Sequence, residues 1–269
     1  MSFHEKYANA REKKNSVLCV GLDPVSIFFK DTGSIPRKYF EKKDEVQGMA
    51  DFCLDLVDQT KSHACAYKIN AQFALPFSIR QLNEITARVS QTGAISIFDL
   101  KLSDIGSSNE SAIYWMKKAG FDAFTYSPFP GNLSEVTQQA HAMDLGVIAL
   151  ALMSHPDARY FMTESQVERQ KGFEWIAESS ARNGIDGLVV GATNPPELIE
   201  ACKAKAAPQT VFLVPGVGTQ EGNAQTVLKI LGENVLVNVG RSLIYSEDPQ
   251  EKAEAYQRKF NEWRQQAKE

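Results

Sequence analysis

The 269-residue sequence predicts a (β/α)8 barrel, the TIM-barrel fold, formed as a single domain. Apolar runs of strand length alternate with segments of helical period eight times, which favours a barrel over an open sheet. The runs are nearly continuous in apolar residues, as expected for parallel strands covered on both faces. No stretch rich in Pro, Gly or Ser divides the chain, so we expect one domain over residues 1–269.

The expected strands are runs rich in β-branched and apolar residues that end at turn or loop residues. In chain order they span residues 16–23, 63–70, 94–101, 122–128, 146–154, 187–193, 211–218 and 235–241. Two longer connections follow strands, at residues 24–42 and 155–166. Loops of this length at the strand ends of a barrel are often lids or binding loops, and we expect that role here.

The segments between the strands have the period of a helix. After residue 43, Val46, Met49, Cys53 and Val57 stand three or four positions apart and form one apolar stripe. Further helices are expected at about residues 2–13, at 78–91, 108–119, 132–144, 166–183, 195–204 and 221–231, and at the C-terminal end. The motif NPPE at residues 194–197 predicts a helix start with Asn194 as the N-cap.

Composition and charge exclude several classes of function. The chain is 43% hydrophobic and 23% charged, and its net charge of −4 comes from interspersed acids and bases. We therefore expect no nucleic-acid partner and no membrane-surface patch. The charged start of the chain is unlike a signal peptide, and no segment approaches the ~18 apolar residues of a membrane span, so the expected location is the cytoplasm. The four cysteines include no C-x-x-C pair and are expected to be buried free thiols.

Polar side chains gather at the C-terminal ends of the expected strands. They are Asp23, Lys68, Asp99, Lys101, Ser154, Thr193 and Arg241. In a barrel these ends converge on one mouth. Within the third strand a period of two places Asp99 and Lys101 on one face, toward the barrel axis. A single ion pair would simply close the barrel, but charges of both signs on neighbouring strands predict a network built for chemistry.

The ends of the last two strands suggest a phosphate site. The run PGVGTQEG lies between strand seven and a helix, and VGR ends strand eight. Glycines let backbone N–H groups approach an anion, and an arginine binds phosphate in bidentate fashion. The loops after strands seven and eight commonly hold phosphate in barrel enzymes. No zinc-type cluster and no G-x-S-x-G elbow is present, and we interpret His155 as a capping or packing residue.

Six motifs occur together in an order that resembles one family. GLDP, YKIN, DLKLSDIGSS, MSHPDA, PGVGTQEG and VGRSLIYS span residues 21–246, and VVGAT at 189–193 is similar to a run of the longer, divergent branch. The chain thereby resembles the orotidine 5′-phosphate decarboxylases, which complete de novo pyrimidine synthesis. The resemblance implies decarboxylation of orotidine 5′-monophosphate to uridine 5′-monophosphate and CO2, with no cofactor and no metal.

The resemblance also implies the catalytic residues. Lys68, Asp99, Lys101 and Asp104 would form an alternating network of charges, in which Lys101 stabilises and then protonates the ring carbanion. Asp104 and Ile105 would reach into the active site of a partner subunit, which implies a homodimer with shared active sites.

Substrate contacts follow from the same resemblance. Asp23 and Lys68 would hold ribose hydroxyls, as would Ser108 from the partner, where the family often has threonine. Ser154 would bond the pyrimidine, and Gln220 would bridge the base and the phosphate. Arg241 and the backbone around Gly218 and Gly240 would bind the phosphate.

Two alternatives remain open from the sequence. One is a related metal-dependent barrel acting on sugar phosphates, such as a keto-gulonate-phosphate decarboxylase; that group shares D-x-K-x-x-D but resembles an acid, for magnesium, at the position of Lys68. The other is a phosphate-binding barrel without catalysis, whose mark would be the loss of a catalytic charge. None of the charges is missing here, so the metal-free enzyme is preferred.

Overall fold

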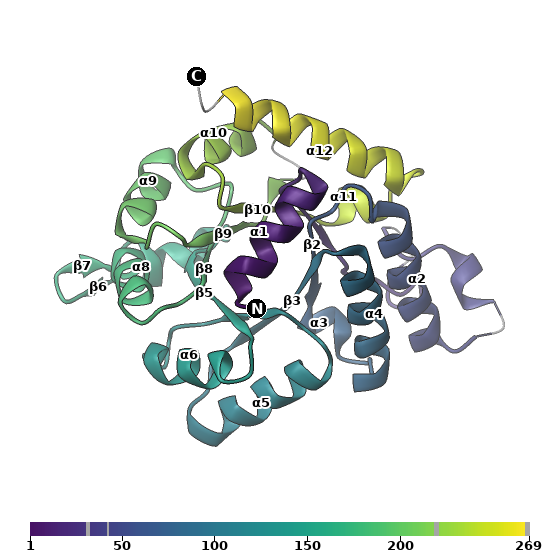
Figure 1. Cartoon of the computed structure of the whole chain (residues 1–269), viewed down its shortest axis with the longest axis horizontal. Coiled ribbons are helices and arrows are strands. Elements are labelled where there is room, and N and C mark those ends of the chain that lie inside the picture. The colour runs from purple at the N-terminus through teal and green to yellow at the C-terminus, as the bar shows by residue number, and fades with distance from the viewer. Residues whose placement is uncertain (31–32, 42, 218–220, 267–269) are drawn as a thin grey trace.

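A closed barrel of parallel strands lies at the centre of the computed structural model, which describes residues 1–30, 33–41, 43–217 and 221–266 (Figure 1). Around the barrel the strands are β1 (Leu18–Gly21), β2 (Ala66–Asn70), β3 (Ile95–Leu102), β4 (Ala123–Tyr126), β5 (Gly146–Leu152), β8 (Gly187–Val190), β9 (Val211–Val214) and β10 (Val235–Val239), which pairs with β1. Each lies within or overlaps a predicted strand. The predicted (β/α)8 barrel is confirmed.

Helices surround the barrel in Figure 1. The longer ones are α2 (Glu45–Thr60), α4 (Ile79–Thr92), α5 (Gly106–Lys118), α6 (Leu133–His141), α8 (Gly172–Arg182), α9 (Pro196–Lys205), α10 (Glu221–Leu231) and α12 (Pro249–Gln266). Short helices are α3 (Ala71–Ala74), α7 (Arg159–Met162) and α11 (Arg241–Ile244), and 3-10 turns are η1 (Arg37–Phe40) and η2 (Pro156–Ala158). Over the described residues, no helix has both the length and the apolar character needed to cross a membrane.

The amphipathic pattern of α2 explains how the outer helices pack. Asp44 caps the helix by accepting a hydrogen bond from the Gln47 backbone N–H, and Met49, Cys53 and Val57 are buried as their spacing predicts. They belong to the larger of two apolar clusters, which fills the space between the barrel and its helices. The inward-facing strand residues form the second cluster.

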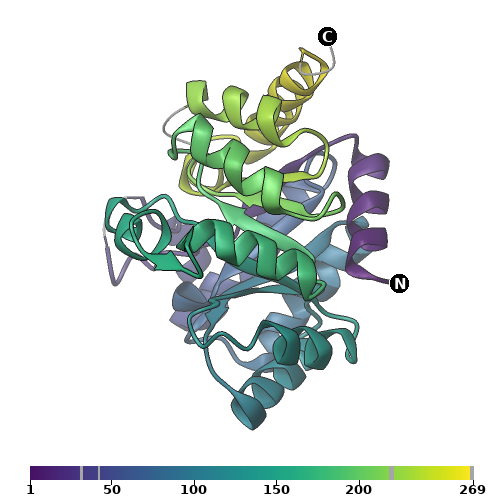
Figure 2. The same cartoon turned by 90° about the vertical axis from the view of Figure 1, so that its left-hand side faces the viewer.

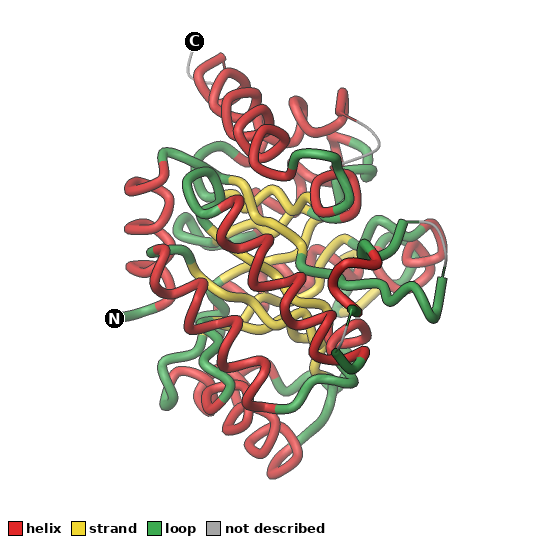
Figure 3. The backbone as a smooth tube through the Cα atoms, turned by 90° about the vertical axis from the view of Figure 1, so that its right-hand side faces the viewer, coloured by secondary structure: helices red, strands yellow, loops and turns green. Residues whose placement is uncertain are grey.

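The N-terminal helix α1 (Phe3–Lys14) closes one end of the barrel. Ser2 and Glu5 form a capping box at its start, and Phe3, Tyr7 and Ala10 pack against the inner cluster. Figure 1 shows α1 across the centre of the barrel, and Figure 2 shows it at the end opposite to the loop of residues 24–42. Figure 3 shows the N-terminus on the left-hand side and loops on both sides of the strands. The open mouth therefore lies at the carboxyl ends of the strands.

Two local predictions were wrong. The helix expected over residues 166–183 begins at Gly172, because β6 (Gln166–Val167) and β7 (Gln170–Lys171) form a hairpin. Its turn residues Glu168 and Arg169 have φ of 50° and 66°, values that no α-helix contains. Asn194 is not the N-cap of α9, since that position is Pro195. The Asn194 amide instead donates to the carbonyl of Gly191 at 2.9 Å and ties down the end of β8.

All four cysteines are buried free thiols, as predicted. Cys19 and Cys65 belong to the inner cluster, and Cys53 and Cys202 to the outer one. Burial raises the pKa of Cys65 and of Cys202 to about 12. These thiols are therefore protonated and shielded at neutral pH.

Candidate active site

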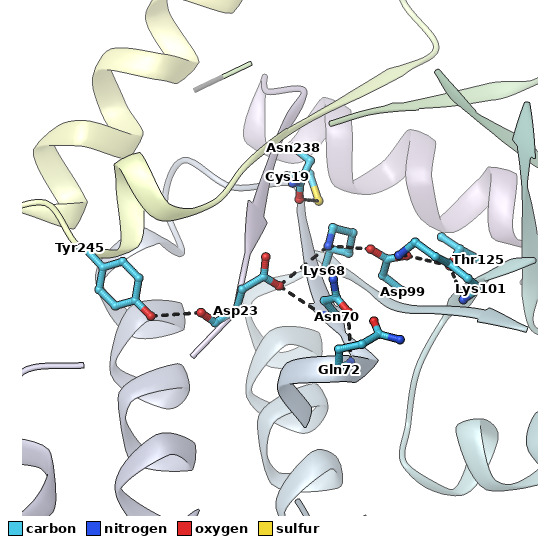
Figure 4. Close-up of polar contacts among 10 residues, drawn as sticks. All are labelled: Cys19, Asp23, Lys68, Asn70, Gln72, Asp99, Lys101, Thr125, Asn238 and Tyr245. Atoms are coloured by element: carbon cyan, nitrogen blue, oxygen red, sulfur yellow. Dashed lines mark hydrogen bonds and ion pairs between the residues drawn. The ribbon is translucent and has the colours of Figure 1, made fainter. Parts of the chain in front are cut away.

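Two lysines from neighbouring strands meet one carboxylate in the barrel mouth (Figure 4). Lys68 of β2 places Nζ 3.0 Å from Asp99 Oδ2, and Lys101 of β3 places Nζ 2.7 Å from Asp99 Oδ1. The Lys68 and Asp99 side chains are 5% and 12% exposed, whereas that of Lys101 is 33% exposed. The carboxylate is thus held between two ammonium groups, and only Lys101 opens toward the mouth. The sequence correctly predicted that these three residues lie together.

Asp23 extends the charged array from the end of β1. Its Oδ1 lies 3.9 Å from Lys68 Nζ and accepts a hydrogen bond from the Asn70 backbone N–H at 3.4 Å. The Tyr245 hydroxyl donates to the carbonyl of Asp23 at 3.1 Å and accepts from the Val25 N–H at 2.8 Å. These bonds fix the backbone that carries Asp23, which leaves one side of its carboxylate toward the mouth.

Lys68 and Asp99 stay charged because each has partners of opposite charge. Burial alone would lower the pKa of Lys68, but Asp23 and Asp99 raise it above its ordinary value. Burial would likewise raise the pKa of Asp99, but Lys68 and Lys101 lower it from 3.8 to about 2. The Lys68 ammonium and the Asp99 carboxylate are therefore both ionised at neutral pH.

The backbone of β3 departs from regular alternation at Lys101. Lys101 has φ of 53°, and the pairing with β4 shifts between Phe98 and Leu102. We expected a regular period of two through residue 101, and this is wrong for the backbone at Lys101. Asp99 and Lys101 nevertheless lie in the same site. The Lys101 N–H donates to Thr125 Oγ1 at 2.9 Å. Bulged strands near active sites often aim a side chain in this way.

Three predicted site residues after β3 lie on the surface of the chain. The Asp104, Ile105 and Ser108 side chains are exposed, and Ile105 is 63% exposed. Asp104 Oδ1 accepts from the Ile105 N–H at 2.8 Å. In the described part of this single chain, Asp104 makes no ion pair with Lys101. The structure thus joins three of the four predicted catalytic charges and leaves the fourth on the surface.

Two amide side chains hold the backbone of Asp104. Its carbonyl oxygen accepts from Asn109 Nδ2 at 2.5 Å and from Asn132 Nδ2 at 3.2 Å. Asn109 is fully buried in α5, and Asn132 accepts a hydrogen bond from the buried hydroxyl of Tyr126 at the end of β4. The exposed carboxylate therefore projects from a backbone that is anchored to two elements of the barrel.

Only part of the predicted phosphate site lies within the described residues. Gly240 is the N-cap of α11, and Arg241, its first residue, is exposed. A pocket of about 440 Å³ is lined by Asp23, Phe29 and Arg241 among others. The pocket therefore joins the predicted ribose and phosphate residues. The predicted contacts of Gly218 and Gln220 lie outside the described residues.

Ser154 lines a second pocket at the mouth, of about 520 Å³, with His155, Arg159 and Thr193. The Thr193 hydroxyl donates to the carbonyl of Ser154 at 3.3 Å. A Cβ added at Gly191 would lie 2.7 Å from the Ser154 backbone nitrogen. The glycine of the VVGAT run therefore lets β8 approach the segment that carries Ser154.

The comparisons with known proteins agree with this geometry. A family model described as orotidine 5′-phosphate decarboxylase / HUMPS matches residues 16–256. The chain belongs to this family. It is 33% identical to the orotidine 5′-phosphate decarboxylase of Variovorax paradoxus over 276 residues, which cover 96% of this chain and 95% of that protein. It is 30% identical to that of Leptospira interrogans, over 91% of this chain and 88% of the other.

Solved structures of the family have the same architecture. The OMP decarboxylase of Leishmania donovani superposes with a TM-score of 0.81 at 27% identity, over 98% of this chain and 99% of that one. The UMP synthase of the same organism gives a TM-score of 0.82 at 28% identity and is covered over 57% of its length. The family resemblance inferred from the motifs is therefore confirmed.

Sequence reasoning missed the residues that support the site. Beyond the predicted members of the family motifs, the structure adds Asn70, Asn109, Thr125, Asn132 and Tyr245. Only Thr125 gave a usable signal, because a polar residue within an apolar strand needs a hydrogen-bond partner when it is buried. Asn70 ends β2, and the others lie within or at the ends of helices, where amides and hydroxyls are ordinary residues.

Proposed function

We propose that this chain converts orotidine 5′-monophosphate to uridine 5′-monophosphate and CO2, the decarboxylation step of de novo pyrimidine biosynthesis. The observation that supports it is the array in which Lys68 and Lys101 hold the Asp99 carboxylate at 3.0 and 2.7 Å in the barrel mouth. The lysine at position 68 also argues against the magnesium-dependent alternative, which requires an acid there. The reaction would take place in the cytoplasm, where the four free thiols stay reduced.

Substrate binding follows from the two pockets at the mouth. The pocket shared by Asp23 and Arg241 would take the ribose and the phosphate, with Lys68 also facing the ribose. Gln220 and the backbone at Gly218 and Gly240 would complete the phosphate and base contacts. The pyrimidine would then point toward Ser154.

Lys101 would perform the chemistry. When the bond between the ring carbon and the carboxylate breaks, CO2 leaves and the electron pair stays on a carbon that no neighbouring carbonyl can delocalise. The Lys101 ammonium stabilises this pair and then donates a proton to the carbon. Attraction between unit charges at ~4 Å is about 4 kcal/mol at an effective dielectric near 20, or about three powers of ten in rate. Preorganised charges and phosphate binding energy must supply the remainder.

Asp99 would serve the reaction in two ways. Its carboxylate lies 2.7 Å from Lys101 Nζ and holds the ammonium group in the mouth through the attraction of opposite charges. Its position between two lysines also places a fixed negative charge close to where the substrate carboxylate must lie, which favours departure of CO2. Both effects depend on the 2.7 Å contact between Asp99 Oδ1 and Lys101 Nζ.

We place Asp104, Ile105 and Ser108 in the active site of a second subunit. Their exposure and their anchored backbone support this arrangement, because a largely exposed Ile105 beside the mouth is better covered by another subunit than by water. Asp104 would complete the charge network in trans, and Ser108 would contact the partner's ribose. The functional unit would then be a homodimer with two shared sites.

The decisive assay follows the absorbance of orotidine 5′-monophosphate with the purified protein. We expect Lys101→Ala to abolish turnover while uridine 5′-monophosphate still binds, and Lys118→Ala, an exposed lysine of α5, to behave as wild type. Substantial turnover by Lys101→Ala would refute its role. Activity lost to EDTA and restored by Mg²⁺ would support the metal-dependent alternative, and nucleotide binding without any absorbance change would support a binding protein.

Mixing inactive variants tests the shared site. Lys101→Ala and Asp104→Ala should each be inactive alone, since each lacks one required charge in both sites. In a mixed dimer, one site combines an intact Lys101 with an intact Asp104, so random mixing should recover about a quarter of wild-type activity. No recovery after denaturation and refolding of the mixture would argue against a site completed in trans.

A further inference from the structure

Thr125 links the two central residues of the site through one hydroxyl group. It is fully buried in β4, and its Oγ1 lies 2.8 Å from Asp99 Oδ1 and 2.9 Å from the Lys101 backbone nitrogen (Figure 4). Asp99 Oδ1 is the same oxygen that accepts from Lys101 Nζ. The hydroxyl therefore contacts both the carboxylate and the backbone of the lysine paired with it.

The direction of both hydrogen bonds is fixed by chemistry. A backbone N–H can only donate, and an ionised carboxylate can only accept. The Thr125 hydroxyl must therefore accept from Lys101 and donate to Asp99. Serine would reproduce this pattern. Valine, which has nearly the same shape, would leave the Lys101 N–H without its acceptor and would remove one of the two donors to Asp99 Oδ1.

The same bond compensates for the irregular backbone of β3. Lys101 has φ of 53°, and the regular pairing with β4 holds at Phe98 and resumes at Leu102. A residue other than glycine is strained in this region of φ. The Lys101 N–H loses its place in the ladder there, and Thr125 Oγ1 takes the hydrogen bond. Thr125 thereby stabilises the conformation that brings the lysine side chain to Asp99.

We propose that Thr125 is a positioning residue that holds the Lys101 ammonium and the Asp99 carboxylate in register for protonation of the ring carbanion. The role rests on the proposed decarboxylation, in which the reacting carbon must meet this ammonium group. Thr125 is too deeply buried to touch substrate and acts through Lys101 and Asp99. Its loss should therefore affect the turnover rate far more than nucleotide binding.

The test compares Thr125→Val, Thr125→Ser and Thr60→Val. Thr60 is the matched control, because it is also fully buried and its hydroxyl contacts two groups, the carbonyl of Leu56 and the hydroxyl of Tyr67. We expect Thr125→Val to lower kcat by about 100-fold, as a misplaced reacting group does, with the Kd for uridine 5′-monophosphate changed less than about threefold. Thr125→Ser should recover most of kcat, and Thr60→Val should keep the wild-type kcat.

Several results would overturn the proposal. They are a kcat of Thr125→Val equal to that of Thr60→Val, a failure of Thr125→Ser to exceed Thr125→Val, or a loss of nucleotide binding as large as the loss of kcat. If Thr125→Val does not fold, Thr125→Cys, which keeps the size but hydrogen-bonds weakly, takes its place with the same expectations.

A crystal structure of Thr125→Val separates this proposal from the proposed function. We expect Lys101 Nζ to leave Asp99 Oδ1 or the φ of Lys101 to relax, and this readout needs no turnover. An unchanged pair would overturn the positioning role even if the wild-type protein is an active decarboxylase. If the Lys101–Asp99 pair is displaced in Thr125→Val but the wild-type protein leaves orotidine 5′-monophosphate unchanged, the positioning role of Thr125 stands and the proposed reaction is refuted.

Discussion

Lys68 and Asp99 form a 3.0 Å ion pair that is almost completely removed from water, whereas Lys101, the second cation on Asp99, is 33% exposed. Loss of one partner from a buried pair leaves an uncompensated charge, which typically costs 3–5 kcal/mol. Breaking the pair should therefore destabilise the barrel, and this cost can be measured separately from the proposed role of the pair in catalysis.

Lys68→Met should lower the free energy of unfolding by about 3 kcal/mol, because the Asp23 and Asp99 carboxylates lose their shared buried cation. Lys101→Met is the matched variant and should lower it by less than about 1 kcal/mol, since Lys101 is partly exposed and Asp99 keeps Lys68. Urea denaturation followed by circular dichroism gives both values. Equal losses in the two variants would contradict the stated difference in burial.

Acid should remove the contribution of Asp99. Burial would raise the pKa of its carboxyl group, but Lys68 and Lys101 lower that pKa to about 2, so the stabilisation is full above the unfolded value near ~4 and is lost as pH falls through about 2. It amounts to about 2 kcal/mol. The free-energy difference between the wild type and Asp99→Asn, measured by urea denaturation, should be constant from pH 7 to 5 and shrink below pH 4. A difference that stays constant down to pH 2 would contradict the ionised pair.

Arg241→Ala should raise the Kd for uridine 5′-monophosphate by about 10- to 100-fold, which is the effect of losing a hydrogen bond to a charged group. Uridine, which lacks the phosphate, should bind the variant and the wild type equally. Isothermal titration calorimetry measures both ligands, and Arg80→Ala, a highly exposed arginine of α4, is the control. An equal rise in the Kd for uridine would mean that Arg241 does not face the phosphate.

Asn109→Ala should reduce turnover by releasing the carbonyl of Asp104, which Asn109 Nδ2 holds at 2.5 Å. The loss of turnover should appear in the partner's site. Mixing Asn109→Ala with Lys101→Ala should therefore restore activity, as mixing Asp104→Ala with Lys101→Ala should. The control is Asn83→Ala, which removes a similar amide contact, to the carbonyl of Lys118, away from the site. Recovery in the Asp104 mixture without recovery in the Asn109 mixture would place the role of Asn109 in its own subunit.

The barrel and its charged mouth were predictable from local pattern alone. Apolar runs of strand length, alternating with helical stripes, located the strands, and the polar residues at or near the end of each run located Asp23, Lys68 and Asp99. The left-handed backbone at Lys101 was not predictable, because it depends on a hydrogen bond that the Lys101 N–H donates to Thr125, 24 residues away in the chain. The hairpin before α8 was missed because its turn residues, Glu168 and Arg169, are not types that usually adopt a positive φ. Asn194 was misassigned because its amide bonds back to Gly191 and does not cap α9.

A site completed by a second subunit lies beyond any pattern within one chain. The motif that contains Asp104 was recognisable by resemblance, but its spacing cannot say whether the carboxylate turns back to Lys101 or outward. The single chain leaves it outward, with its backbone anchored by Asn109 and Asn132. Only a property of the assembly, such as activity restored in mixed dimers, can assign that carboxylate to a site.

Each of the two apolar clusters contains two of the four thiols, and these can report chemically on the opening of that cluster. Cys19 and Cys65 lie among the inner strand residues, whereas Cys53 and Cys202 lie under the outer helices. A thiol reagent can modify them only when the covering layer opens. Labelling rates followed by mass spectrometry would therefore distinguish detachment of an outer helix from opening of the barrel wall, without any engineered probe.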